Sequence, residues 1–567
     1  MLPLTDPASL QGRVDAQWPD AAQIRKLAEL LVRWPSVGGT AGEAEFAPRL
    51  HGFLRDWPYF RANPDDLVLL DSHGSPMTRN LVAIVRGQGS RALALAGHYD
   101  TVAIDNYHDL APLACQPNRL ACALLDDLSS RPLTTQEARA RDDLASGDFL
   151  PGRGMLDMKS GLAAGLAVLE RFASLPNRQG NLVMLITPDE ERESRGMRAL
   201  RRDLPELMKA RGLRIAGAVN MDVTSDQGDG QAGRAVYHGS IGKLLPFALV
   251  VGQSAHAAYP FEGTSAALIG AEILRAVEGN SALADTQGGD IAPPPICLEA
   301  RDLRGGYEVT TPERVWLAFN WLYHSGSAAE RFAQFQALVA GAAEQAQRAF
   351  AAKAADFAAL SDNRVAPAEP APLPVLTLAE LRARACADAA TQAAFDDFEQ
   401  GLAQIDNPLE LSRRLAEWLV DAAQLTGPAV VVGFAGLHYP PASLDPARPR
   451  AAALLRAIAR TEAALSSDPQ ARLCHRPYFQ GISDISFLGQ PAQAGAEVIA
   501  QNTPAARLVD HPEPGALEFP VVNIGPWGRE FHQRLERVYA PYAFHTLPRI
   551  LALLADEFLM QDTTPGG

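Results

Sequence analysis

The stretch LVMLITPDEERESRG, residues 182–196, places three consecutive carboxylates directly after a run of apolar residues. The apolar part, Leu182–Ile186, has the length and composition of a strand that is buried on both faces. The acids are Asp189, Glu190 and Glu191, and two like charges about 4 Å apart repel by roughly 4 kcal/mol at an effective dielectric constant near 20. Taken alone, the triplet suits a solvated loop that opens a helix, because acids favour a helix N-terminus. The surrounding sequence decides between that loop and a functional site.

Strand-like and helix-like patterns alternate along the chain around this stretch. Further apolar runs predict strands at 81–85, at 92–97 and in IAGAVNMDV, which ends at Val223. Helical periodicity covers 22–34 and 161–175. Strands separated by helices indicate an α/β domain with a mostly parallel sheet flanked by helices. Ligand sites in such domains lie beyond the carboxyl ends of the strands, so the acidic triplet lies where a ligand would bind.

A different pattern begins after the Gly-rich segment 226–234 and is typical of a smaller α+β unit. Its predicted strands are 235–239, 247–251 and 314–323, and its predicted helices are 265–277 and 328–360.

The chain then passes through VAPAEPAPLPV, 365–375, which has the composition of a Pro-rich linker. The later apolar run PAVVVGFAG, 428–436, predicts a return to the buried parallel sheet. We therefore predict a main domain in two parts, 1–229 and 377–567, with a second domain, 230–376, inserted between them.

Composition limits the classes of function. The 567 residues are 47% hydrophobic and 21% charged, which is ordinary for globular domains. The formal charge of −15 argues against sequence-independent binding to nucleic acid or to an anionic membrane. The sequence lacks an apolar run of the roughly eighteen residues that a membrane span needs, and its N-terminal stretch does not resemble a secretion signal. The five cysteines are scattered and odd in number, so we expect a reducing, cytoplasmic location.

Histidines and acids recur at the ends of the predicted strands. His98 and Asp100 follow the run ALALAG, and in such a pair the acid can hold one imidazole nitrogen while the other binds a metal. Asp157 lies in a Gly-rich turn before a helix, Asp222 ends a strand, and His532 follows GREF. Each of them alone suits a structural role, as a loop histidine or a helix-capping acid.

Their joint arrangement favours a metal centre. The candidate ligands should converge on one edge of the sheet; they are His98, Asp157, Glu191, Asp222 and His532. Three of these five ligands suit one cation and three suit a second, if one carboxylate is shared and bridges two cations about 3.5–4 Å apart. Two cations would also neutralise carboxylates that could not otherwise share a small volume. The mixed His, Asp and Glu set favours zinc, and cobalt or manganese suit the same geometry.

Four motifs carry a family resemblance: GHYDTV, GRGMLDMKSGLAAG, PDEERESRG and GREFHQRLERV. They resemble the metal-dependent exopeptidase and deacylase family that includes carboxypeptidase G, the aminoacylases, acetylornithine deacetylase and peptidase T. GQSAHAAYPFEGTSA resembles the motif around a histidine in the lid domain of that family. A finer resemblance, to arginine-utilisation proteins of the RocB type, rests on TTPERVWLAFNWL, GISDISF and NIGPWGREFHQRLERVYAPY. The family resemblance implies a zinc-exopeptidase-like catalytic domain, and it implies that the inserted domain is a lid and dimerisation domain.

The resemblance also assigns roles to residues. It implies that Asp157 bridges two cations, which are held by His98, Asp157 and Asp222 on one side and by Asp157, Glu191 and His532 on the other.

Three further residues would belong to the catalytic machinery. Glu190 would be the general base, a role that a carboxylate beside a metal-activated water can fill. Asp100 would orient His98, and His256 of the lid would donate a hydrogen bond to the oxyanion of the tetrahedral intermediate. The resemblance further implies a cis peptide bond between Asp157 and Met158.

The expected function is that of a two-metal amidohydrolase that cleaves a peptide-like or N-acyl amino-acid amide bond, with a role in arginine catabolism. The expected partner is an amino-acid derivative or short peptide, and the lid could form a homodimer. The alternative is a non-catalytic relative that binds an amino acid or acts in regulation. Many family members carry an Asp-x-Arg pair on a lid strand, whereas the comparable strand here reads VWLAFNWLYH, so substrate preference is not inherited.

Overall fold

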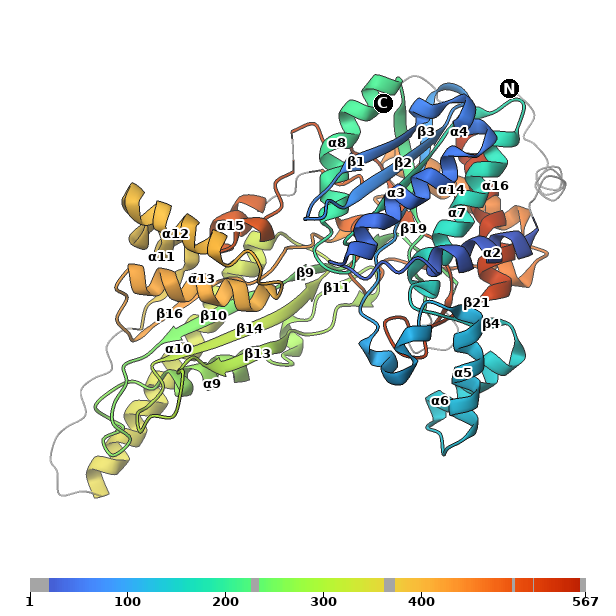
Figure 1. Cartoon of the computed structure of the whole chain (residues 1–567). Helices are drawn as coiled ribbons and strands as arrows, with labels where there is room; N and C mark the ends of the chain where they lie inside the picture. The colour runs from blue at the N-terminus through green and yellow to red at the C-terminus, as the bar shows by residue number, and fades with distance from the viewer. Residues whose placement is uncertain (1–19, 226–233, 361–372, 492–494, 513, 561–567) are drawn as a thin grey trace. The chain divides into compact units, whose positions relative to one another are not determined.

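The computed structural model describes residues 20–225, 234–360, 373–491, 495–512 and 514–560. The chain forms two compact units (Figure 1). Unit 1 contains Met1–Ser240, Ala442–Pro491 and Pro512–Gly567, and unit 2 contains Ile241–Pro441 and Ala492–His511.

Unit 1 is built on an eight-stranded sheet whose strands run in the order β1-β2-β5-β3-β6-β19-β7-β18. Their bounds are β1 Leu67–Asp71, β2 Arg79–Val85, β3 Gln88–His98, β5 Gln179–Thr187, β6 Arg214–Asn220, β7 Ala235–Tyr237, β18 Cys474–Arg476 and β19 Val521–Asn523. β3 pairs in parallel with both β5 and β6, and β19 pairs in parallel with β6. The carboxyl ends of these neighbouring strands therefore meet at one edge of the sheet.

Helices pack against this sheet and share its main hydrophobic core. The helices in this core are α2 Ala21–Val32, α3 Ala41–Arg55, α7 Ser160–Ser174, α14 Pro449–Ala464 and α16 Leu547–Met560, while α8 Arg195–Arg211 packs against β1, β2, β5 and β6. α7 is buried along almost its whole length, because Gly and Ala on its surface let strands and helices approach closely. A separate hairpin of α5 Pro117–Ser129 and α6 Thr135–Ser146 has its own small core of leucines.

Unit 2 contains a six-stranded sheet with the order β13-β14-β10-β16-β15, and β9 pairs with β14. The bounds are β9 Gly242–Leu244, β10 Pro246–Val251, β13 Ile296–Asp302, β14 Arg314–Tyr323, β15 Val375–Thr377 and β16 Ala429–Phe434. Along β10, Ala248 and Val250 face one hydrophobic core, while Phe247, Leu249 and Val251 face another. This alternation is the period of two that a strand imposes.

The two cores of unit 2 belong to different helices. The first contains side chains of α9 Ala266–Val277 and α10 Ala328–Leu360, and the second contains side chains of α11 Leu378–Ala385, α12 Ala389–Gly401 and α13 Pro408–Ala422. The sheet of unit 2 is thus covered on both faces.

The predicted α/β fold class is confirmed, but the return of the chain to the parallel sheet at 428–436 is wrong. That run forms β16, which pairs with β10 and β15 in unit 2. A strand that is buried on both faces has the same apolar composition in either sheet, so its sequence does not encode which sheet it joins. The chain returns from unit 2 to unit 1 at Ala442, whereas we predicted that the second part of the main domain begins at 377. The Gly-rich segment 226–233 and Pro-rich residues up to 372 lie outside the described residues.

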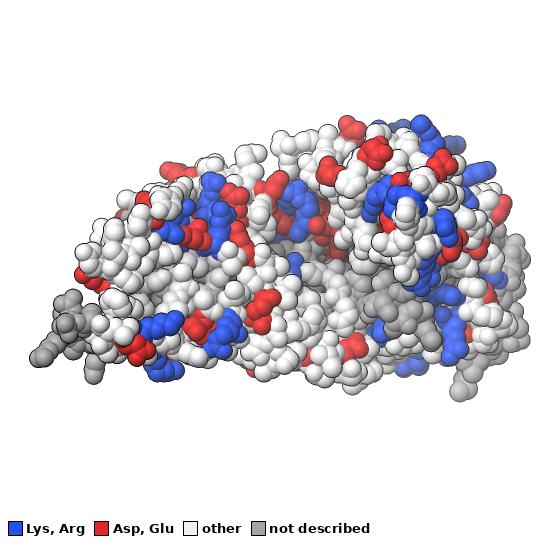
Figure 2. All heavy atoms as spheres, turned by 90° about the horizontal axis from the view of Figure 1, so that it is seen from below, with Lys and Arg blue, Asp and Glu red and all other residues white. Residues whose placement is uncertain are grey.

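Two features concern the surface. In the described part of the chain, the structure contains no helix that is long and apolar enough to cross a membrane. On the face shown in Figure 2, basic and acidic side chains are interspersed, and they do not separate into a basic and an acidic half.

Candidate active site

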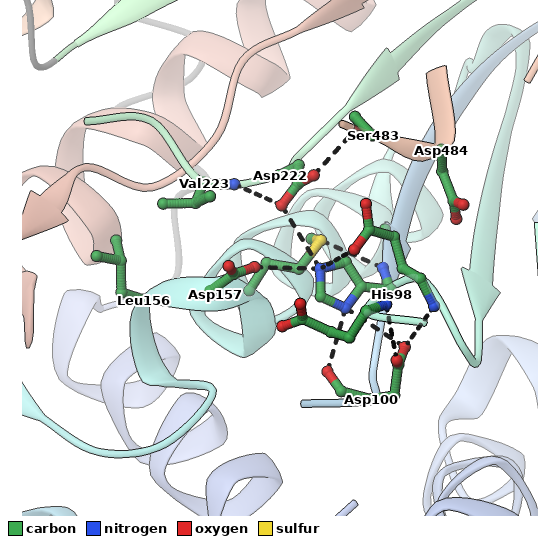
Figure 3. A network of polar contacts seen from close by, with 12 residues as sticks. His98, Asp100, Leu156, Asp157, Asp222, Val223, Ser483 and Asp484 are labelled. Carbon is green, nitrogen blue, oxygen red and sulfur yellow. Dashed lines mark hydrogen bonds and ion pairs between the residues drawn. The ribbon is translucent and has the colours of Figure 1, made fainter. Parts of the chain in front are cut away.

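His98, Asp157 and Asp222 form one trio at the carboxyl edge of the unit 1 sheet. His98 ends β3, Asp222 follows the neighbouring β6, and Asp157 lies in the turn before α7. His98 Nε2 lies 3.1 Å from Asp157 Oδ1 and 3.5 Å from Asp222 Oδ1. Figure 3 shows dashed lines from the imidazole of His98 to both carboxylates. All three residues are at least nine-tenths buried.

A second trio uses the other oxygen of the same aspartate. His532 Nε2 lies 3.1 Å from Asp157 Oδ2 and 2.9 Å from Glu191 Oε2. Glu191 follows β5, and His532 lies in the loop between β20 Gly528–Arg529 and β21 Arg537–Tyr539. The structure therefore brings together all five residues that were predicted as metal ligands, with Asp157 between the two trios. His98, Asp157 and Glu191 also form a compact group of atoms within 4.8 Å of one another.

The spacing of these atoms fits two small cations. Ligands about 2.0–2.1 Å from a tetrahedral Zn²⁺ are separated from one another by about 3.3 Å. The nitrogen-to-oxygen distances in the two trios are 2.9–3.5 Å. Imidazole nitrogens and carboxylate oxygens are the donors that zinc, cobalt and manganese accept. By this test the donor set suits two divalent cations that share one carboxylate.

Asp100 organises both the histidine and the acidic loop. Its Oδ1 accepts a hydrogen bond from the Glu190 backbone N–H at 3.1 Å, and its Oδ2 accepts one from the Glu191 N–H, also at 3.1 Å. The Asp100 carbonyl oxygen lies 3.1 Å from His98 Nδ1. Because Nδ1 faces this oxygen, Nε2 is directed at the carboxylates of the first trio. Asp100 therefore orients His98 mainly through its backbone and orients Glu190 and Glu191 through its side chain.

Glu190 lies beside the first trio, and its Oε2 is 3.9 Å from His98 Nε2. Burial, together with the charges of Asp222, Asp484 and Glu191, raises its pKa well above the usual range. Burial and Asp157 likewise raise the pKa of Glu191 to about 7.

The histidines respond to the same crowding of acids. Burial disfavours the charged form of His532, but Asp157 and Glu191 outweigh it and raise its pKa to about 11. Burial is similarly outweighed at His98, whose pKa rises well above its usual range beside three carboxylates. This dense negative charge is the electrostatic environment that cations compensate.

The acidic loop has a support that sequence reasoning missed. Asp189 has a positive φ of 66° and is fully buried, and its two carboxylate oxygens accept hydrogen bonds from the Arg195 guanidinium at 2.7 and 2.8 Å. Its backbone carbonyl accepts from Ser194 N–H at 2.7 Å. The first acid of the triplet therefore closes the loop from which the other two project. The available signal was an acid shortly before the start of α8, because the helix dipole favours a carboxylate there.

The GISDISF segment also contributes residues to the site. Ser483 Oγ donates a hydrogen bond to Asp222 Oδ2 at 3.3 Å, as the dashed line in Figure 3 shows. Thr187 Oγ1 donates to Asp484 Oδ2 at 3.1 Å, and burial raises the pKa of Asp484 to about 7. Ser483 thus fixes the orientation of a candidate metal ligand.

A second group of donors, Glu43, His73 and Asp189, has the spacing of a metal site. Both oxygens of Asp189 already accept from Arg195, and that guanidinium would repel a cation at this position. The group does not suit a metal ion for that reason.

Two other predicted features have distinct outcomes. The peptide bond between Asp157 and Met158 is cis, which confirms the prediction.

His256 lies in unit 2, where its exposed ring accepts a hydrogen bond at Nδ1 from the Ala258 N–H at 3.1 Å. A neutral imidazole that accepts at Nδ1 carries its proton at Nε2, so His256 presents a donor to its surroundings.

Comparisons with known proteins place this geometry in context. The model of Peptidase family M20/M25/M40 matches residues 133–510. The uncharacterized protein YqjN of Bacillus subtilis (strain 168) is 30% identical over 564 residues, which cover 97% of this chain and 98% of YqjN. Protein RocB of the same organism is 28% identical over 94% of both chains. Among solved structures, aminopeptidase PepT from Bacillus cereus ATCC 10987 has a TM-score of 0.53 and 14% identity, and the alignment covers 95% of this chain and 99% of PepT.

Proposed function

Because the chain belongs to peptidase family M20/M25/M40, we propose that it is a two-metal amidohydrolase that cleaves a peptide-like or N-acyl amino-acid amide bond. The observation that carries this proposal is the shared carboxylate of Asp157, whose two oxygens each lie 3.1 Å from the Nε2 of a different histidine. A bridging carboxylate between two nitrogen and oxygen trios is the arrangement that dinuclear hydrolases use.

The proposed cofactors are two divalent cations, with zinc as the first choice because the donors combine imidazole and carboxylate. When bound, they would polarise the scissile carbonyl and lower the pKa of a water molecule towards 7. The proposed ligands are His98, Asp157, Glu191, Asp222 and His532.

The residues of the chain would then perform the proton transfers. Glu190 takes a proton from the attacking water and returns it to the leaving amine, which requires a carboxylate beside the reacting atoms. Asp100 holds the backbone of Glu190 and keeps Nε2 of His98 directed at the first trio. From the family resemblance we assign to His256 the donation of a hydrogen bond to the oxyanion, and its protonated Nε2 supports that assignment.

The non-catalytic alternative is less well supported. A binding protein needs neither a general base nor five clustered donors, whereas this chain carries all of these residues at one edge of the unit 1 sheet. Each loss of a carboxylate would reduce the like-charge repulsion in the site. The retention of the whole set therefore favours a hydrolase.

The substrate class stays broad because the lid strand β14 offers no arginine at the expected place. Phe319 and Trp321 are buried there, and Asn320 is only partly exposed. A substrate carboxylate would need another partner. We include arginine and ornithine derivatives among the candidates, because the resemblance to RocB-type proteins suggests a role in arginine catabolism, in the cytoplasm.

We also propose a homodimer through unit 2. The strand β13 lies at the edge of its sheet and exposes Ile296 and Leu298, which are 46% and 47% exposed. An exposed apolar edge strand favours pairing with another chain. Light scattering of the wild-type protein and of Leu298→Lys tests this, since a dimer through β13 should dissociate in the variant, and an unchanged mass would reject it.

The function is tested by screening the zinc-loaded protein against dipeptides and N-acyl amino acids, including arginine and ornithine derivatives. We expect turnover of at least one class by the wild-type protein and none by Glu190→Gln. Tight binding of an amino-acid derivative without any turnover, in protein that holds two zinc ions, would instead support the non-catalytic alternative.

A further inference from the structure

A buried ion pair lies directly behind the candidate metal site. Arg153 is 1% exposed and Glu536 is fully buried, and Arg153 Nη1 lies 2.5 Å from Glu536 Oε2. The two residues are 383 positions apart in the sequence. Arg153 also lies over the ring of Tyr107, 5.2 Å from its centroid. Neither residue belongs to the set of proposed ligands or proton carriers.

One end of the pair holds the turn that carries Asp157. Glu536 Oε1 accepts a hydrogen bond from the Leu156 N–H at 3.2 Å and a longer one from the Asp157 N–H at 3.5 Å. These N–H groups belong to the turn before α7, where the bridging carboxylate originates. A negative charge that accepts from both of them fixes the backbone from which Asp157 projects.

The other end holds the loop that carries His532. Arg153 Nη2 donates to the His532 carbonyl oxygen at 3.3 Å and to Asn106 Oδ1 at 2.9 Å, while Asn106 Nδ2 donates to the same carbonyl at 2.8 Å. His532 has a positive φ of 64°, a conformation that non-glycine residues rarely adopt. Two donors on its carbonyl oxygen therefore hold a backbone that has little intrinsic preference for this shape.

Stability alone does not account for the pair. Burying two charges costs several kcal/mol per ion, and apolar residues of similar volume are often as stable or more so. A guanidinium with its donors in a rigid fork and a carboxylate with two separate acceptors can instead connect several backbone groups at fixed angles. That is how both residues are used here.

We propose that Arg153 and Glu536 are positioning residues for the second cation site, the one formed by Asp157, Glu191 and His532. The pair contacts the backbone of two of the three ligands in that trio. In the first trio it contacts only the bridging Asp157, whereas His98 and Asp222 are held by Asp100 and Ser483. Loss of the pair should therefore weaken the second site and spare the first. This inference rests on the proposed two-metal function.

The test compares metal binding by metal-free wild-type protein and by Glu536→Gln, titrated with Zn²⁺ against a chromophoric chelator. The wild-type protein should bind two equivalents tightly. Glu536→Gln should keep one tight equivalent and bind the second roughly 10–100-fold more weakly, which is the usual effect of removing a residue that orients a ligand. Asn106→Ala provides a milder variant that leaves the ion pair in place, and it should weaken the second site less.

Asp556→Asn is the matched control. It breaks another buried pair in unit 1, Arg171–Asp556, where Arg171 Nη2 lies 2.8 Å from Asp556 Oδ2 between α7 and α16. If the Arg153–Glu536 pair had only a structural role, Glu536→Gln and Asp556→Asn should both lower the unfolding temperature of the metal-free protein and should bind zinc alike. Our inference predicts that Asp556→Asn keeps two tight equivalents. Equal zinc binding by Glu536→Gln and Asp556→Asn would overturn the inference, and so would equal weakening of both sites in Glu536→Gln. A wild-type protein that binds no zinc would instead reject the proposed function itself.

Discussion

The two oxygens of Asp157 face different partners, since Oδ1 lies 3.1 Å from His98 Nε2 and Oδ2 lies 3.1 Å from His532 Nε2. The pKa of this carboxyl lies below its usual range, because His532 and His98 stabilise the charged form more strongly than burial disfavours it. The charged form of Asp157 is therefore favoured between the two histidines. Glu190, in contrast, is not one of the proposed ligands, and its Oε2 lies 3.9 Å from His98 Nε2 of the first trio.

This difference leads to a prediction for two substitutions. Glu190→Gln should leave two metals bound but abolish turnover, because the base is lost and the ligands remain. Asp157→Ala should remove metal from both sites, because both trios use its carboxylate. Metal analysis after dialysis, together with activity on a substrate found by screening, measures both effects. Loss of both ions from Glu190→Gln would show that the division of roles is wrong.

A second prediction concerns His256, whose Nδ1 accepts from the Ala258 N–H. His256→Ala should lower kcat by about 10²–10³, the usual cost of removing an oxyanion donor, with a modest change in KM. Metal content and unfolding temperature should stay at the wild-type level, because the side chain is exposed and all five proposed ligands lie in unit 1. His108→Ala is a control for loss of a histidine outside the proposed roles. Full activity of His256→Ala would exclude the assigned role.

At the scale of elements, Asp285 joins the end of β14 to the start of α10. Its Oδ2 accepts hydrogen bonds from the backbone N–H groups of His324 and Ser325, both at 2.7 Å, and Arg331 Nη2 lies 3.3 Å away. Burial raises the pKa of Asp285, but these donors outweigh burial and lower it below the usual range.

The lowered pKa predicts a pH dependence with a definite sign. The charged carboxylate stabilises the folded state above the unfolded pKa of about 3.9, and this contribution is lost as pH falls through the lower folded pKa. Asp285→Asn should reduce the free energy of unfolding at pH 7 by on the order of 1–2 kcal/mol. The difference from the wild-type protein should shrink at acid pH, where both side chains are neutral. Urea unfolding between pH 7 and pH 2 measures this difference, with the exposed Asp356→Asn as control, and a difference that stays constant down to pH 2 would show that the charge of Asp285 does not stabilise the fold.

Elements with a strong local pattern were predictable from the sequence. The run Leu182–Ile186 lies in β5, and the helical stretch 328–360 forms α10 with the same bounds. The candidate ligands could be named because each follows a strand or turn, where the topology of parallel sheets makes side chains converge. The destination of β16 could not be predicted, because its apolar residues suit either sheet equally.

The residues that hold the ligands of the site in position could not be predicted from the sequence either. Arg153 and Glu536 look like ordinary surface charges in the sequence, and 383 residues separate them. Only the fold shows that both are buried and that they meet. The same applies to Ser483, a small polar residue without a pattern of its own, which contacts Asp222 from 261 positions away.

At the scale of the whole molecule, each unit has its own hydrophobic core, and the proposed ligands all belong to unit 1. Unfolding of the zinc-loaded protein should therefore show two calorimetric transitions. A chelator should lower the temperature of one transition only, because a ligand stabilises the unit that binds it, by about 4 kcal/mol when present at a thousand times its Kd. Asp157→Ala should lower the same transition. A chelator that shifts both transitions equally would contradict this assignment.

The position of β19 has a consequence for the way the protein is made. This strand, Val521–Asn523, lies between β6 and β7 inside the sheet, although the ribosome synthesises it about three hundred residues after β6. While unit 2 emerges, the nascent chain presents β6 with one unpaired edge, a surface that invites pairing with other chains. The segment that closes this edge is followed directly by the loop of His532. Newly made protein would thus gain the last of the proposed metal ligands only after the strand that seals its sheet has been made, so an unfinished chain would lack the complete proposed site.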